Sequence, residues 1–357
     1  MPSNNRGGRW EEMKMGLSSK RLVFALFATS ACAGAAYGQA SYPCANDAPN
    51  PYHLVQNWAQ TPRPWSHPLA VTVDAKDNLW VFDRCEEAGC AASKASPIFE
   101  LGSNGKGMKN FGAGLFVFPH GIGADKDGNV WVADGDVKDG RGMQVTKLSP
   151  EGKVLMTLGK PGQGKGSKAT DVFDQPTAVV VGSNGDIFVA EGHGPTFGNS
   201  RIVKFDKSGK LIKTFGKLGS GDGELKEPHA MAIDKQDRIF IADRSNARVV
   251  AFDKDGKFIA AWKQFGRPSG IWVDANDMLY TVDSQSSDDP KSPNYNAGCK
   301  MGLRIGSTKD GKVTAFIPPP PVSDPKLPPP EGIAVDSRGN IYAAAQQQND
   351  VKKYVKN

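Results

Sequence analysis

The sequence repeats one pattern six times: a strand, a tight turn rich in Asp and Gly, and a second strand. Two of the copies read "PHGIGADKDGNVWVADG" and "PHAMAIDKQDRIFIADR". The first turn residue falls at positions 74, 125, 182, 234, 274 and 336, and it is Asp in all copies except the third, so that copies are 40 to 62 residues apart. A repeat of this length, with a hairpin at its centre, is typical of β-propeller blades.

A second hairpin follows most copies and completes a four-stranded unit. Examples are "QVTKLSPEGKVLMTLG" from Gln144 and "RIVKFDKSGKLIKTFG" from Arg201. The abundance of Gly (41) and Pro (25) also favours short strands joined by tight turns. The sequence therefore predicts an all-β fold, a six-bladed β-propeller of the NHL-repeat type over residues 67–357.

The two ends of the repeat region predict how the ring closes. After the sixth copy only one strand remains, "DVKKYVKN", whereas "YHLVQNWAQ" (52–60) is a spare strand at the other end. We expect the N-terminal segment 39–66 to supply the missing strand of the last blade, which would remove two exposed sheet edges.

Residues 1–38 have the pattern of a cleaved signal peptide. Lys20 and Arg21 precede the apolar run 22–36, and small residues at 36–38 suit a cleavage site. Residues 1–12 look like an upstream extension, and the alternative for the signal is a lipoprotein site at Cys32. The apolar run is too short for an integral membrane span. We therefore expect a secreted or periplasmic protein.

Charge gives no reason to expect nucleic-acid binding. The full chain carries 44 basic and 38 acidic residues, and segment 1–38 removes five and two of them, which leaves 39 minus 36, or +3. We expect a monomer that takes a small-molecule or peptide substrate.

Four cysteines remain after the predicted signal peptide, an even number that suggests two disulfides in an exported chain. Four cysteines allow three connectivities, of which we favour Cys85–Cys90 and Cys44–Cys299. The alternative is a zinc-binding cysteine cluster, but the spacing matches no common zinc motif.

One position of the repeat carries residues suited to metal binding. In a propeller, equivalent positions of the blades are related by rotation about one axis, so they are presented to the same region. Five residues before each turn marker stand Leu69, His120, Thr177, His229, Ser269 and Glu331. The second, fourth and sixth blades thus supply His, His and Glu with three-fold geometry. This predicts a divalent metal site that favours zinc, with iron or manganese as alternatives. The alternative is a polar, water-filled channel without metal.

A second position, just past the end of the second strand, carries Arg84, Arg244 and, one residue further on in the third blade, His193. Arginine can bind a substrate carboxylate through two parallel hydrogen bonds, and a histidine can transfer protons near neutral pH. The alternative for the arginines is an ion pair with the adjacent Asp83 or Asp243.

These stretches resemble the NHL-repeat propellers, and in particular peptidyl-α-hydroxyglycine α-amidating lyase, over residues 68–354. "FVFPHG" and "EPHAMAI" are similar to the segments that hold two zinc histidines of that family, which correspond to His120 and His229. "VFDR" and "IADR" are similar to the segments with its active-site arginines, at Arg84 and Arg244. The chain departs from the family at Glu331, where the resemblance implies a third zinc histidine, at Gly332, where it implies a calcium-binding acid, and at His193, where it implies a catalytic tyrosine.

The resemblance implies an exported, metal-dependent lyase that cleaves the C–N bond of an α-hydroxyglycine-like carbinolamide to an amide and glyoxylate. His120, His229 and Glu331 would bind the metal, Arg84 and Arg244 the carboxylate, and His193 the proton. The alternatives are a non-catalytic NHL propeller that binds a protein or cell-wall ligand, and a propeller hydrolase or lactonase.

Overall fold

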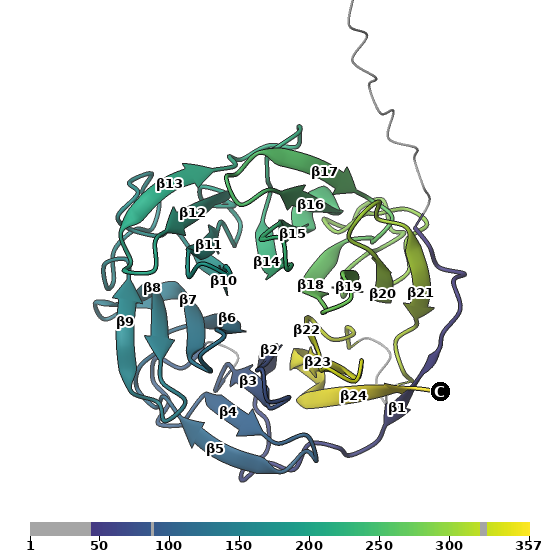
Figure 1. The fold of residues 1–357 in the computed structure, drawn as a ribbon, viewed down its shortest axis with the longest axis horizontal. Coiled ribbons are helices and arrows are strands. Elements are labelled where there is room, and N and C mark those ends of the chain that lie inside the picture. The colour runs from purple at the N-terminus through teal and green to yellow at the C-terminus, as the bar shows by residue number, and fades with distance from the viewer. Residues whose placement is uncertain (1–43, 87–88, 322–326) are drawn as a thin grey trace, which may run out of the picture. The chain divides into compact units, whose positions relative to one another are not determined.

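Six four-stranded antiparallel sheets are arranged around a central axis in the computed structural model (Figure 1), which confirms the predicted six-bladed propeller. The structure describes residues 44–86, 89–321 and 327–357. The predicted signal peptide, including Cys32, lies outside the described residues.

The strands occupy equivalent places in each blade. The innermost strands are β2 (Pro68–Val73), β6 (Pro119–Ala124), β10 (Pro176–Val181), β14 (Pro228–Ile233), β18 (Pro268–Val273) and β22 (Gly332–Val335). The second strands are β3 (Leu79–Asp83), β7 (Val130–Lys138), β11 (Ile187–Glu191), β15 (Ile239–Asp243), β19 (Met278–Asp283) and β23 (Ile341–Ala345). The third are β4 (Ile98–Leu101), β8 (Arg141–Leu148), β12 (Arg201–Phe205), β16 (Arg248–Phe252), β20 (Gly302–Ser307) and β24 (Asp350–Lys356). The outermost are β5 (Gly107–Phe111), β9 (Val154–Leu158), β13 (Leu211–Phe215), β17 (Phe258–Trp262), β21 (Val313–Ile317) and β1 (Tyr52–Val55).

Two short 3₁₀ helices, η1 (Arg244–Asn246) and η2 (Gln346–Gln348), follow the second strands of the fourth and sixth blades. Within the described residues, no helix is long and apolar enough to cross a membrane.

The turn aspartates explain why the repeated hairpins are so regular. Asp74 accepts hydrogen bonds from the backbone N–H groups of residues 76 and 78, which fixes the turn. Its second oxygen accepts a hydrogen bond from the indole of Trp80, 3.1 Å away, in the following strand. The same i to i+6 contact recurs between Asp and an aromatic side chain in three other blades: Asp125–Trp131, Asp274–Tyr280 and Asp336–Tyr342.

The last blade is completed by the N-terminal strand, as the sequence predicts. Strand β1 pairs with β24, with Tyr52 opposite Lys356 and Val55 opposite Lys353. The strand is shorter than the expected 52–60, because Asn57 has a positive φ of 52° that ends the extended run. Gln60 then forms an isolated parallel bridge with the first blade, so this segment contacts both sides of the closure.

Disulfides join Cys44 to Cys299 and Cys85 to Cys90, the two favoured pairs. Cys299 precedes β20, so the first bridge attaches the N-terminal segment to the fifth blade. Two further contacts hold that segment: the Phe316 N–H donates to the Pro49 carbonyl, and Arg304 donates to the side chain of Asn46.

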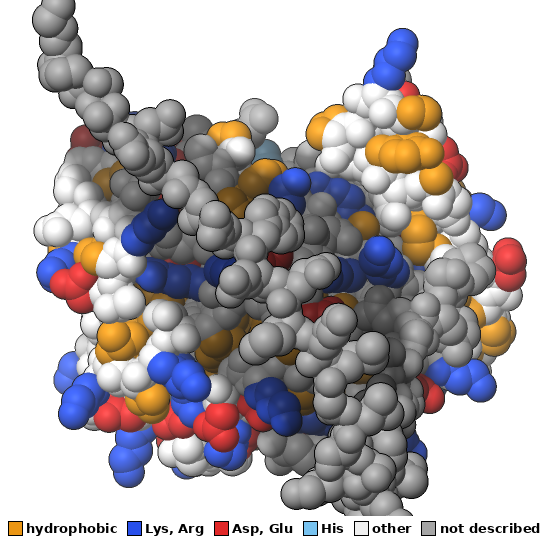
Figure 2. Space-filling view, turned by 90° about the horizontal axis from the view of Figure 1, so that it is seen from above, with side chains coloured by type: hydrophobic (Ala, Val, Ile, Leu, Met, Phe, Trp, Pro, Cys, Tyr) orange, Lys and Arg blue, Asp and Glu red, His pale blue; other side chains and the backbone are white. Residues whose placement is uncertain are grey.

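The view in Figure 2 shows both basic and acidic side chains on the described part of the visible face. Several of them form exposed ion pairs, including Lys126–Asp127 and Lys254–Asp255. Such pairs contribute little to stability, so the hydrophobic contacts between blades carry the fold.

Removing the long-range disulfide should destabilise the protein more than removing the local one. The Cys44–Cys299 bridge spans 255 residues and the Cys85–Cys90 bridge only 5. Loop-closure entropy predicts losses of about 5 kcal/mol for Cys44→Ser/Cys299→Ser and about 2 kcal/mol for Cys85→Ser/Cys90→Ser. Urea unfolding of both double variants measures the difference. Equal losses would contradict the larger stabilisation expected from the bridge that attaches the N-terminal segment to the fifth blade.

Candidate metal and substrate site

The residues at the predicted inward-facing position of the six blades meet at the propeller axis. Leu69, His120, Thr177, His229, Ser269 and Glu331 all line one central cavity of about 170 Å³. Each lies at or just before the start of an innermost strand, directly after a proline. Equivalent positions in the repeat therefore surround one small volume.

His120 and His229 are held in one tautomer by the neighbouring blades. The Nδ1 of His120 lies 2.9 Å from the carbonyl oxygen of Thr177, and the Nδ1 of His229 lies 2.7 Å from that of Ser269. Because a carbonyl oxygen only accepts hydrogen bonds, Nδ1 carries the proton in both rings. Each Nε2 is therefore left with a free lone pair, as in histidines that bind metals.

Burial keeps both imidazoles neutral. Their exposed fractions are 4% and 5%, and this burial lowers the pKa of each ring well below its usual value. The positive charge of Arg244 lowers both pKa values further, and that of Arg84 also lowers the pKa of His120. Neutral imidazoles are the form that coordinates a cation.

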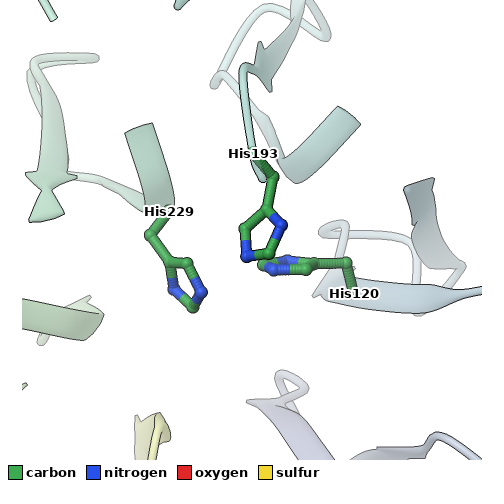
Figure 3. Close-up of side chains that lie close together, drawn as sticks. All are labelled: His120, His193 and His229. Carbon is green, nitrogen blue, oxygen red and sulfur yellow. The ribbon is translucent and has the colours of Figure 1, made fainter. Parts of the chain in front are cut away.

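His193 joins this pair from the loop after β11 (Figure 3). Its ring centroid lies 4.7 Å from that of His120 and 5.4 Å from that of His229. One nitrogen from each of the three rings lies within 4.8 Å of the others. Gly192, with a φ of 127°, allows the chain to turn here, since a Cβ at this position would meet the carbonyl oxygen of Phe197 at 2.6 Å.

Glu331 lies beside this cluster. Its Oε2 is 4.0 Å from the Nε2 of His229, and its side chain is 13% exposed. Among the described residues, the group close enough to share a metal ion consists of the three histidines. The role of Glu331 as a metal ligand stays a prediction.

The donor set fits a divalent cation. Three neutral, largely buried imidazoles with a carboxylate nearby are ligand types that suit zinc, and two histidines with one carboxylate also suit Fe(II). The chemistry of these donors therefore agrees with a metal site, and the choice of metal remains a prediction.

Arg84 approaches the site from the first blade. Its guanidinium stacks on the ring of Phe118 at 3.8 Å, and its Nε donates to the carbonyl of Pro119. Burial lowers the pKa of Arg84 to about 10, so it is charged at neutral pH. The carboxylate of the adjacent Asp83 binds Arg63 instead, so the alternative ion pair is absent.

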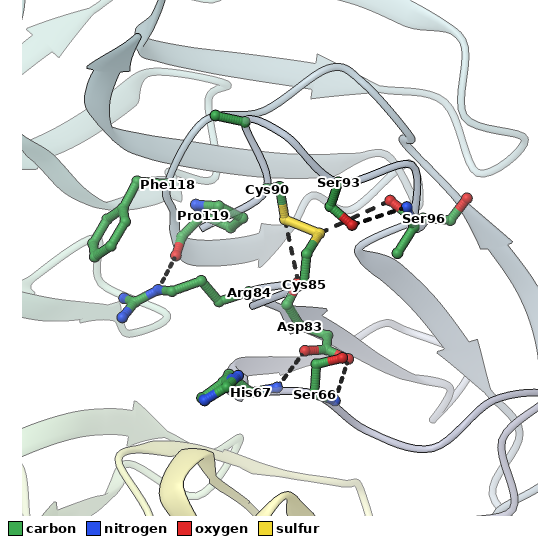
Figure 4. The surroundings of a disulfide bond; sticks show 12 residues. Ser66, His67, Asp83, Arg84, Cys85, Cys90, Ser93, Ser96, Phe118 and Pro119 are labelled. Atoms are coloured by element: carbon green, nitrogen blue, oxygen red, sulfur yellow. Dashed lines mark hydrogen bonds between the residues drawn. A yellow bond between two sulfur atoms is a disulfide. The ribbon is translucent and has the colours of Figure 1, made fainter. Parts of the chain in front are cut away.

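The Cys85–Cys90 disulfide directly follows Arg84 (Figure 4). The backbone N–H of Cys90 donates to the carbonyl of Val117, one residue before Phe118. The disulfide loop thus ties the residue after Arg84 to the segment against which the guanidinium stacks, which restricts the position of Arg84.

Arg244 is paired, but with a residue that the sequence did not indicate. Its Nη2 donates to Glu227 at 2.5 Å and lies 3.3 Å from the Nε2 of His193. The adjacent Asp243 binds Arg248 instead, so the expected alternative partner is again engaged elsewhere.

Glu227 connects several groups beside the histidine cluster. One oxygen binds Arg244 and lies 3.8 Å from His193, and the other accepts a hydrogen bond from Ser245. Burial opposes ionisation, but the hydrogen bond and charge of Arg244 outweigh it and lower the pKa of Glu227. The one sequence feature that could have pointed to Glu227 is its position as an acid immediately before the "PHA" of the fourth blade.

Comparisons with known proteins agree with this architecture. A family model described as a 6-bladed beta-propeller matches residues 184–295. The chain is 34% identical over 200 residues to peptidylglycine alpha-amidating monooxygenase of Rattus norvegicus, covering 49% of this chain and 19% of that protein. It is 30% identical over 211 residues to peptidyl-alpha-hydroxyglycine alpha-amidating lyase 2 of Drosophila melanogaster, covering 54% and 49%.

The human NHL repeat-containing protein 3 is 35% identical over 174 residues, covering 47% of this chain and 45% of that protein. The chain is thus a six-bladed β-propeller homologous to the alpha-amidating lyases and to NHL repeat proteins. The matches span about half of the length of these relatives, or less.

Solved structures share the fold. A gluconolactonase from Xanthomonas campestris has a TM-score of 0.56 at 14% identity, covering 88% of this chain and 97% of that one. A streptogramin B lyase has a TM-score of 0.51 at 14% identity, covering 86% and 98%. At this identity the likeness concerns the fold alone.

Acid should destabilise the metal-free protein through His193. Burial lowers the pKa of His193 to about 4, from an ordinary value of 6.5. Between these values the unfolded chain binds a proton that the folded chain does not, so stability falls as the pH drops from about 6.5 to about 4. The loss attributable to this residue is at most about 3 kcal/mol.

Unfolding of the EDTA-treated protein and of His193→Gln across this pH range measures that contribution. The stability of the variant should depend less on pH. Parallel curves for the two proteins would contradict a neutral, largely buried His193.

Proposed function

We propose that the protein is an exported, metal-dependent lyase that cleaves an α-hydroxyglycine-like carbinolamide to an amide and glyoxylate. The observation that carries the proposal is the cluster of three imidazoles on the propeller axis beside two buried arginines. Homology to the alpha-amidating lyases supports it, and the two disulfides support export.

His120 and His229 would hold the metal through their free Nε2 atoms, with either Glu331 or His193 as a third ligand. A bound divalent cation supplies Lewis acidity that lowers the pKa of a substrate hydroxyl. An anionic Glu331 would reduce that acidity relative to a third neutral ligand.

Arg84 and Arg244 would bind the substrate carboxylate. Both guanidiniums are buried, and they reach the site from the first and fourth blades. Charge-assisted hydrogen bonds from arginine to carboxylate are strong and directional in such surroundings. They would fix the hydroxyl-bearing carbon next to the histidines.

With Glu331 as the third metal ligand, His193 would be free to move the proton. A guanidinium only donates hydrogen bonds, so Nε2 of His193 accepts from Arg244 and its ring proton lies on Nδ1. A substrate carboxylate that draws Arg244 away frees Nε2 to take the hydroxyl proton. The C–O⁻ electrons then form the aldehyde, the C–N bond breaks, and the amide nitrogen receives the proton, which gives the primary amide and glyoxylate.

Purified wild-type protein should contain stoichiometric metal, and the double variant His120→Ala/His229→Ala should lose it. These two rings supply the Nε2 atoms whose lone pairs are free to bind a metal. Elemental analysis of the two proteins is the measurement, with circular dichroism to verify folding. A folded wild type that stays metal-free after incubation with Zn, Fe and Mn would contradict the metal site and favour a binding module.

The third ligand can be identified by comparing Glu331→Gln with His193→Gln. The variant that lacks the true ligand should lose more than about 100-fold in zinc affinity, because loss of an outer-shell partner alone costs about 10-fold to 100-fold. The other variant should lose less than that. Competition with a chromophoric chelator measures both affinities. If neither variant weakens zinc binding, both assignments are wrong.

Incubation with a peptide that ends in α-hydroxyglycine should release glyoxylate. Arg84→Gln should lower kcat/KM by about 100-fold, because a buried charge-assisted contact is lost. Exposed Arg338→Gln serves as the control, since it removes the same charge from the turn between β22 and β23. No glyoxylate from metal-loaded protein would rule out this substrate class.

A non-catalytic binding module is the second candidate. The similarity to NHL repeat-containing protein 3 is as high as that to the lyases over a similar share of the chain. Metal content and glyoxylate release distinguish the two functions.

A further inference from the structure

Arg267 occupies the position before the inner strand of the fifth blade, one blade beyond Glu227. It directly precedes Pro268, as Glu227 precedes Pro228. Its side chain is buried, with 7% of the residue exposed. The repeat does not require a charged residue at this position. Its backbone N–H donates to Asp283, which fixes the start of β18.

The guanidinium of Arg267 shares the carboxylate that holds Arg244. Its Nη2 lies 3.7 Å from Glu227 Oε2 and donates to the hydroxyl of Ser245 at 3.4 Å. Glu227 therefore lies between two arginines, with one oxygen toward each. One negative charge faces two positive charges.

Two buried donors of this pair have no hydrogen-bond partner among the described residues. They are the Nε of Arg244 and the Nη1 of Arg267. A buried charged donor without an acceptor costs free energy, and such groups call for an explanation. An anionic ligand between the two guanidiniums would satisfy both donors.

The neighbouring carboxylates of the described residues do not accept hydrogen bonds from these two donors. Asp283 is engaged by Ser286 and by backbone N–H groups, and it lies 3.8 Å from Arg304. Glu331 acts on Arg267 and Arg84 through its charge, but no hydrogen bond joins it to either within the described chain. Asp283 also acts on Arg267 through its charge, so the two unpartnered donors, and not an excess of positive charge, mark the place for an anion.

We propose that Arg244 and Arg267 form a second anion-binding subsite, and that the preferred substrate carries two carboxylates. The inference rests on the proposed function in taking the region beside the histidine cluster, between the arginines, as the substrate site. The first carboxylate lies between Arg84 and Arg244, and the second meets Arg244 Nε and Arg267 Nη1. A carbinolamide whose amide side chain is acidic has this chemistry.

Calorimetric titration with small carboxylates tests the subsite without any turnover. Malonate, succinate and glutarate are compared with acetate and glyoxylate at constant ionic strength. The best dicarboxylate should bind wild type at least about tenfold more tightly than glyoxylate, which corresponds to about 1.4 kcal/mol. Equal affinities for the two classes would overturn the proposal.

Arg267→Gln should abolish the preference for dicarboxylates and change glyoxylate affinity by less than about threefold. Arg267→Lys retains the charge without the planar fork, so it should keep part of the preference. Exposed Arg338→Gln is the control of equal charge change. If Arg267→Gln weakens both classes equally, Arg267 only supports the structure and the proposal fails; if that variant does not fold, the Lys variant decides in the same way.

The outcomes separate this inference from the proposed function. Glyoxylate binding that depends on Arg84 but shows no dicarboxylate preference would leave the lyase proposal intact and remove the second subsite. A dicarboxylate preference that depends on Arg267, without release of glyoxylate from any carbinolamide, would retain the subsite and remove the lyase.

Discussion

Closure of the ring by the pairing of β1 with β24 is the interaction on which the site depends. A propeller presents equivalent residues to one axis only while its first and last blades are joined. Here four residues of the N-terminal segment complete the last sheet, and the Cys44–Cys299 bridge anchors the same segment to the fifth blade. The geometry at the axis is therefore maintained by contacts at the outer rim.

The repeat position of His120 and His229 buries both imidazoles away from water. The neighbouring blades compensate by accepting a hydrogen bond from each ring. Carbonyls of Thr177 and Ser269 each bind one ring nitrogen of the preceding histidine in this position. Those carbonyls belong to the equivalent residues of blades three and five, so the repeat that supplies the histidines also orients them. Burial and the nearby arginines keep the rings neutral, which favours cation binding over proton binding.

The fold could be predicted from the sequence because each blade repeats its turn aspartate and its strand pattern. The convergence of His120 and His229 could be predicted for the same reason, since rotation relates them. His193 could be predicted as a site residue, but its place among the other two histidines could not, and neither could the bridging role of Glu227. Both depend on loops whose paths the repeat does not determine. The partners of Arg84 and Arg244 could not be predicted for the same reason. Their adjacent acids, Asp83 and Asp243, bind other arginines, and only the packing between loops shows this.

X-ray absorption at the metal edge of the zinc-loaded protein tests the central claim most directly, because it counts the ligands around the ion. Convergence of the histidines at the axis predicts two or three imidazole nitrogens at about 2.0–2.1 Å, with any remaining ligands oxygen. A spectrum without imidazole scattering would contradict it, since the metal would then be bound away from the axis.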